Sequence, residues 1–149
     1  MRPKRTIALC GTLVLLLFVF VASAHAAEPV SQIIANYADI LKANPMPAGE
    51  KAQSIPLASD ATATMFLARF TPGFEVKTHF HKTHSETLYV IEGTGKMVMD
   101  GKETDISPGT IIHIPMGTVH SARITGSGEL IGFQIFAPAW TEPDRVPVP

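Results

Sequence analysis

Four side chains of this sequence have the types and the spacing of metal ligands. His79 and His81 stand two residues apart, Glu86 follows five residues after them, and His120 comes thirty-four residues later. Imidazole nitrogens together with a carboxylate oxygen suit divalent first-row metals. We therefore expect these residues to bind one divalent transition metal ion, and Fe, Mn, Ni, Cu and Zn are all compatible with the ligand set.

The elements that carry these residues are predicted to be β-strands joined by tight turns. His79 and His81 leave the same face of a strand, because successive side chains of a strand point to opposite faces. Residues 82–85 can form the turn that brings the next strand alongside, which puts Glu86 on the same side. His120 directly follows a Pro-x-Gly turn. Ligands from three strands would then meet inside a barrel, and an octahedral ion would keep up to two positions open.

The chain after Gly49 is a series of short β-type runs that end at Gly and Pro turns. The strongest hairpin signal is Asp100-Gly101, since a type I′ turn needs positive φ at both central residues. The predicted strands span residues 62–70, 74–80, 86–92, 96–99, 102–106, 110–114, 119–124 and 129–136. No helical pattern interrupts them, so the sequence predicts one all-β domain of sandwich or barrel type over residues 51–140.

The first 27 residues have the pattern of a secretory signal peptide. A basic start is followed by an apolar run over residues 7–22 and by Ala24-His25-Ala26, a small-x-small cleavage signature. The alternative is an uncleaved anchor, although the run falls short of the ~20 residues that span a bilayer. We expect a periplasmic or secreted protein that has no membrane contact after cleavage.

The remaining chain is small and acidic. It has no cysteine and retains nine basic against thirteen acidic residues, with no basic run, so nucleic acid is not an expected partner. Apolar residues at spacings of three and four predict a helix over residues 29–43, within an N-terminal helical segment at 28–50. The tail at residues 141–149 carries three prolines and is predicted to be extended.

The two ligand-bearing segments resemble the two motifs of the cupin superfamily. The first segment matches at every defining position: Gly73, His79, His81, Glu86 and Gly93. The second matches at Gly109, Pro115, Gly117 and His120, but has Ile124 where the family pattern usually ends in Asn. The resemblance covers about residues 62–137.

This resemblance implies a double-stranded β-helix, the jelly-roll-like cupin barrel, often as a homodimer. It also implies that the metal is held by His79, His81, Glu86 and His120. It leaves the chemistry open, because cupins include dioxygenases, decarboxylases, isomerases, sugar-binding modules and storage proteins, and a fold does not imply a function.

Other polar residues have two interpretations each. His84 and Tyr89 are candidates for general acid–base catalysis, although His84 also fits a solvated turn and Tyr89 a packing role. Arg69 could clamp a substrate carboxylate or emerge at a strand end. Gln134 could bind substrate from a late barrel strand or face outward. His113 is expected to face solvent or a dimer contact.

Three functional hypotheses follow from the sequence. The first is an exported metalloenzyme, of oxygenase, decarboxylase or isomerase type, that acts on a small molecule chelating the metal. The second is a non-catalytic module that binds a small ligand or a metal. The third is a barrel in which the metal is mainly structural. Export as an unfolded chain would favour copper or zinc, which bind most tightly to such ligands.

Overall fold

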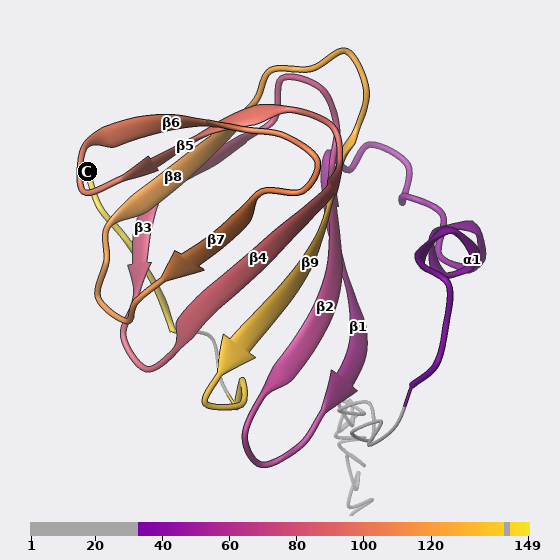
Figure 1. The fold of residues 1–149 in the computed structure, drawn as a ribbon, viewed down its shortest axis with the longest axis horizontal. Helices are drawn as coiled ribbons and strands as arrows, with labels where there is room; N and C mark the ends of the chain where they lie inside the picture. Colours follow the sequence, from indigo (N-terminus) through magenta and orange to yellow (C-terminus); the bar gives the residue numbers. More distant parts are fainter. Residues whose placement is uncertain (1–32, 142–143) are drawn as a thin grey trace, which may run out of the picture.

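Two antiparallel sheets make up the computed structural model, which describes residues 33–141 and 144–149 (Figure 1). The first sheet has the order β1-β2-β9-β4-β7 and comprises Ala52–Ser59, Thr64–Phe70, Leu130–Ala137, Ser85–Glu92 and Ile111–Ile114. The second has the order β10-β3-β8-β5-β6 and comprises Arg145–Pro147, Glu75–His81, His120–Ile124, Gly95–Met99 and Lys102–Ile106. The predicted all-β fold with one short helix is confirmed.

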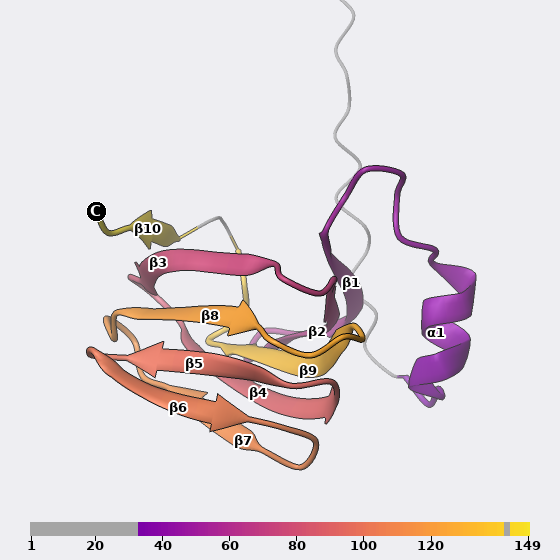
Figure 2. The same ribbon diagram turned by 90° about the horizontal axis from the view of Figure 1, so that it is seen from above.

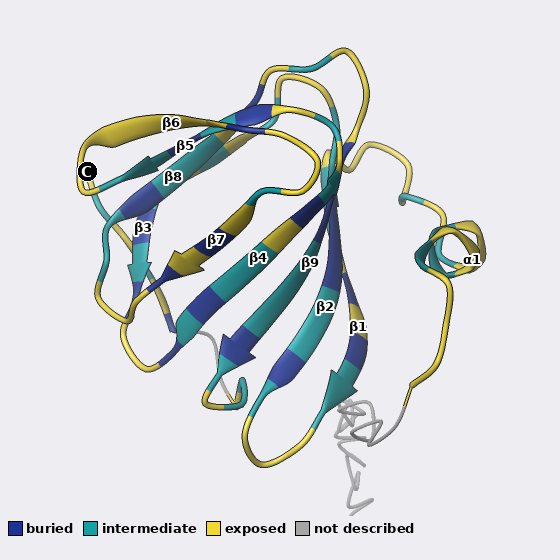
Figure 3. Cartoon of the chain, viewed as in Figure 1, coloured by how far each residue is buried: buried dark blue, intermediate teal, exposed yellow. Residues whose placement is uncertain are grey.

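The core lies between the two sheets and follows from the alternation of side chains along each strand. On β7, Ile112 and Ile114 are buried, whereas Ile111 and His113 are exposed (Figure 3). The buried residues of this cluster are Val90, Met97, Ile106, Ile112, Ile114, Ile124 and Leu130. They come from both sheets, so burial of their apolar surface holds the sheets face to face.

The helix α1 covers part of the outer face of the first sheet. It spans Tyr37–Ala43, so the prediction of helix at residues 33–36 is wrong, whereas residues 29–32 of the predicted helix lie outside the described residues. The reason is local: Asn36 is extended and its side chain accepts a hydrogen bond from the amide of Ala38, as an N-cap does. Apolar side chains of α1 pack against a second buried cluster, which consists of Ile55, Leu57, Leu67 and Ile131.

Two strands were not predicted. β1 precedes the first predicted run and pairs antiparallel with β2. β10 lies in the proline-rich tail, where Arg145 is opposite His81 and Pro147 is opposite His79 on β3. Seen from above, β10 runs alongside β3 at the outer edge of the second sheet (Figure 2). A proline is tolerated there because an edge strand does not need every amide in the ladder.

The predicted hairpin at Asp100-Gly101 joins β5 to β6, with φ of 47° and 81° at the two residues. No helix among the described residues is long and apolar enough to cross a membrane. The predicted signal segment, residues 1–27, lies outside the described part of the chain.

Candidate metal centre

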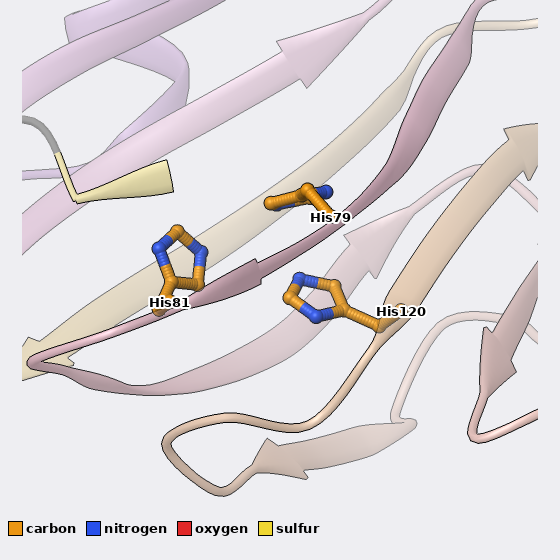
Figure 4. A group of neighbouring side chains, drawn as sticks. All are labelled: His79, His81 and His120. Atoms are coloured by element: carbon orange, nitrogen blue, oxygen red, sulfur yellow. The ribbon is translucent and has the colours of Figure 1, made fainter. Parts of the chain in front are cut away.

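Three histidines meet between the sheets, two on β3 and one on β8 (Figure 4). His79 is directly opposite His120 in the antiparallel pairing of β3 with β8. One candidate ligand atom from each of His79, His81 and His120 lies within 4.8 Å of the other two, and all three residues are buried. The group could therefore hold a metal ion.

Each of these rings is oriented by a hydrogen bond from its Nδ1 atom. Nδ1 of His79 lies 2.8 Å from the carbonyl oxygen of Lys77, and Nδ1 of His120 lies 2.9 Å from that of Thr118. Nδ1 of His81 lies 2.8 Å from Oδ1 of Asp144. Carbonyl and carboxylate oxygens only accept, so the rings donate from Nδ1 and leave Nε2 for a metal.

Glu86 on β4 brings a carboxylate to the same place from the first sheet. Its Oε2 atom lies 3.2 Å from Nε2 of His81 and 3.5 Å from Nε2 of His120. Its Oε1 atom accepts a hydrogen bond from Nε2 of Gln134. Two ligands at 2.1 Å from one metal are about 3.0 Å apart at a right angle and about 3.4 Å apart at a tetrahedral angle. Both distances suit two ligands of one divalent transition metal, so Glu86 adjoins the group of three histidines through His81 and His120. Imidazole and carboxylate donors also suit such a metal chemically.

The protonation states of His79 and Glu86 favour a cation at this site. Burial lowers the pKa of His79 to about 4, helped by the neighbouring His120, Arg145 and His81. Burial opposes ionisation of Glu86, but hydrogen bonds from His120, His81 and Gln134 outweigh it and lower its pKa to about 2. Burial likewise opposes protonation of His81, but hydrogen bonds to Glu86 and Asp144 outweigh it and raise its pKa above 6.5. A metal would replace the proton that His81 otherwise shares with Glu86.

Metal affinity is therefore expected to fall as the pH is lowered through the pKa of His81. The protein must lose this proton to bind metal, so below that pKa the apparent affinity should drop by roughly tenfold per pH unit, and above it the affinity should level off. His79 and Glu86 do not contribute between about pH 5 and 7, because their pKa values lie below that range. Zn²⁺ titration against a competing chelator at several pH values measures this. An affinity independent of pH over that range would contradict the assignment.

A cavity of about 800 Å³ extends from these side chains into the space between the sheets. Its lining is mostly apolar and includes Leu88 and Val90, which share a face of β4 with Glu86. Three phenylalanines contribute as well: Phe66, Phe70 and Phe74. The other residues with charged side chains that line it, apart from Glu86 and the histidines, are exposed: Glu75, Lys77 and Arg145. The candidate metal site thus forms a polar patch on the wall of an apolar cavity.

Gln134 and Arg69 are placed differently with respect to this cavity. Gln134 lines it and contacts Glu86, so it is within reach of a ligand there. Arg69 does not line it. Its side chain shares the outer face of β2 with Met65 and Leu67, which belong to the cluster beneath α1. The structure therefore does not bring Arg69 to the metal site, and a clamp on a substrate carboxylate in this cavity is not available to it.

The two acid–base candidates lie in different environments. Tyr89 alternates with Leu88 and Val90 along β4, is 45% exposed and is among the residues that line the cavity. His84 is 2% exposed, so its interpretation as a solvated turn residue is wrong. Its Nδ1 lies 2.6 Å from Oδ2 of Asp144, and its Nε2 lies 3.2 Å from the carbonyl oxygen of Ala139. With both nitrogens engaged, His84 has none free for a substrate. His113 is exposed, as expected, and contacts Thr87.

Asp144 and Trp140 are two site residues that the sequence did not single out as such. Asp144 bridges His81 and His84. Trp140 lines the cavity and stacks on His84, with ring centroids 5.5 Å apart and an angle of 17° between the planes. The only signal for Asp144 was an acidic residue within a proline-rich tail, which does not by itself indicate a site.

Comparisons with known proteins agree with this architecture. The family model described as a cupin domain matches residues 66–136. A segment of 52 residues is 42% identical to quercetin 2,3-dioxygenase of Bacillus subtilis and covers 35% of this chain but 15% of that protein. The matches to curated relatives span only 15% to 57% of those relatives' lengths.

Solved structures are similar over most of the chain. A protein from Bacillus halodurans gives a TM-score of 0.62 at 23% identity and covers 83% of this chain and 90% of its own. A Klebsiella pneumoniae protein with a double-stranded β-helix domain gives a TM-score of 0.61 at 22% identity, and the match covers 73% of this chain and 91% of that protein. At this identity the likeness concerns the fold. Together with the family match, it shows that this chain carries a domain of the cupin superfamily over residues 66–136.

Proposed function

We propose that this protein is an exported, metal-dependent cupin enzyme that acts on a small organic substrate able to chelate the metal. The observation that carries the proposal is the convergence of three histidines and Glu86 on the wall of a cavity of about 800 Å³. Such a cavity has the size of a small-molecule site, and its few convergent polar groups are what fixes a ligand's orientation.

The apolar lining and Gln134 would have different roles in such an enzyme. The apolar lining would hold the body of the substrate and exclude water, while Gln134 would keep Oε1 of Glu86 occupied so that Oε2 faces the metal. The metal, when bound, would polarise chelating oxygens of the substrate and, if redox-active, activate O₂. Oxygenase, decarboxylase and isomerase reactions all fit this division. The likeness to a quercetin dioxygenase supports the oxygenase type.

The alternative is a module that binds a small ligand without turnover. One feature of the site favours it: both ring nitrogens of His84 are hydrogen-bonded, so this residue has no free group for proton transfer to a ligand in the cavity. Enzymes that depend on general acid–base catalysis need such a group within hydrogen-bond reach of the substrate. If the protein is catalytic, the metal must therefore supply most of the chemistry.

The test is metal analysis of protein purified from its native compartment, followed by assays with each candidate metal. Enols, phenols and α-keto acids are the substrate panel, and O₂ consumption, CO₂ release and isomerisation are the readouts. We expect turnover with one class of chelating substrate. Tight binding of a chelating ligand with no turnover under any metal would support the binding module instead. Purification without bound metal and failure to take up any of the five metals would exclude the metal-dependent enzyme.

Export is the part of the proposal supported by the sequence pattern of the first 27 residues. Expression in a bacterium and sequencing of the N-terminus of the purified protein tests it. We expect cleavage after Ala26 or Ala27, with the protein recovered in the periplasm or the medium. An intact N-terminus in the membrane fraction would favour the anchor.

A further inference from the structure

Asp144 is a buried carboxylate that joins the C-terminal tail to the candidate metal centre. It is 7% exposed and lies directly before β10, the edge strand that pairs with the strand carrying His79 and His81. A carboxylate is rarely buried unless each of its oxygens is compensated. The hydrogen-bond partners of Asp144 therefore indicate its role.

Four donors surround this carboxylate. Oδ1 faces only Nδ1 of His81, at 2.8 Å. Oδ2 accepts from the amide and the hydroxyl of Thr83, both at 2.9 Å, and from Nδ1 of His84 at 2.6 Å. Burial raises the pKa of Asp144, but these hydrogen bonds outweigh it and hold the pKa well below its usual range. One oxygen is thus anchored by three donors, which leaves the other aimed at a single ring.

The C-terminal tail also contacts the backbone carbonyl that accepts a hydrogen bond from His79. The guanidinium of Arg145 donates to the carbonyl oxygen of Lys77 at 3.1 Å, and that carbonyl also accepts from Nδ1 of His79. The C-terminal tail therefore touches the groups that orient two of the three rings. No other side-chain carboxylate contacts Nδ1 of these three histidines in the described part of the chain.

We propose that Asp144 is a positioning residue for the metal ligand His81. It keeps the proton of that ring on Nδ1 and holds Nε2 toward the metal, so the tail completes a site whose ligands all come from the barrel. The inference rests on the proposed metal site and assigns to it a residue outside both ligand-bearing motifs. Carboxylates placed in this way fix the ring orientation and raise the basicity of the ligand nitrogen.

Asp144→Asn separates this role from simple packing, because the amide has nearly the same shape but only one accepting oxygen. Its oxygen would turn to the side of the three donors from Thr83 and His84, and its NH₂ group would then face Nδ1 of His81. Two donors cannot share a hydrogen bond, so the ring must either place its proton on Nε2 or turn away. Either change must be reversed before Nε2 can bind the metal, so zinc binding is weakened.

The experiment measures Zn²⁺ affinity by competition with a chelator, using the full mature protein and zinc alone as the probe. We expect Asp144→Asn to weaken zinc binding by roughly 10- to 100-fold, the usual effect of losing such a partner. Asp105→Asn is the matched control, since it removes an exposed carboxylate that pairs with Lys96 on the outer side of the second sheet. It is expected to change the affinity by less than twofold. Asp144→Glu should recover part of the loss.

A second measurement does not depend on the variant folding. In zinc-loaded wild-type protein with ¹⁵N-labelled histidine, the ring of His81 should carry its proton on Nδ1 and the metal on Nε2. A His81 ring without a proton on Nδ1, or equal zinc affinity in Asp144→Asn and wild type, would overturn the inference while leaving the metal site intact. Absence of zinc binding, and of binding by the other four metals, in the wild type would instead remove the proposed function and this inference together.

Discussion

Replacing His120 with alanine is expected to abolish tight metal binding. His120 supplies one of three imidazoles and is the only ligand candidate on β8, so its loss leaves two histidines on one strand and Glu86 on another. The affinity should fall by more than the roughly 10- to 100-fold that loss of an outer partner costs. Chelator competition measures the affinity, and metal analysis of the purified variant measures the occupancy.

His113→Ala is the control for this variant, because His113 is an exposed histidine on the neighbouring first sheet. It should retain wild-type metal content. Circular dichroism and thermal unfolding of His120→Ala then separate the functional hypotheses. A folded variant without metal or turnover supports the enzyme, whereas unfolding on metal loss supports a structural ion. Wild-type occupancy in His120→Ala would refute the ligand assignment.

Gly93→Ala should destabilise the fold more than any other glycine-to-alanine change at a turn. Gly93 follows β4 with φ of 82°, and an added Cβ would meet the backbone of Glu129 and lie 2.7 Å from Cα of Leu130. The left-handed backbone costs about 1–2 kcal/mol for a residue with a Cβ, and overpacking adds about 1–3 kcal/mol. Urea unfolding of the metal-free protein should show a loss of roughly 2–5 kcal/mol.

Gly101→Ala isolates the conformational part of that cost. Its φ of 81° is almost the same, but nothing lies within 4 Å of the added Cβ. The expected loss is therefore only about 1–2 kcal/mol. Equal losses in the two variants would mean that the approach of the Glu129–Leu130 backbone to Gly93 is not a close contact in solution.

The ligand positions followed from local geometry, which is why the sequence predicted where they would lie. His79 and His81 share a face because a strand has a period of two, and the hairpin at Asp100-Gly101 depends on the φ values of adjacent residues. Leu88 and Val90 line the cavity because the same alternation puts them on the face of Glu86. None of these features depends on which strands become neighbours.

The face on which Arg69 lies could not be decided in this way. On β2, the residues toward the cavity and the residues toward α1 are both apolar, because the helix buries the outer face of the sheet. The alternation of side chains along β2 therefore does not indicate which face points toward the cavity. Only the packing of α1 shows that Arg69 faces outward. β9 is also buried on both faces, so both of its faces are mostly apolar. Gln134 lies on the inner face, toward the cavity.

By itself, the sequence determined the cupin motifs, the all-β class and the four candidate ligands, because each rests on spacings of a few residues. The tertiary structure alone decided that a tail of mixed prolines and charges becomes the edge strand β10 and carries Asp144 to His81, sixty-three positions earlier. Such a contact arises from strand pairing across the whole domain, and short-range patterns contain no information about it.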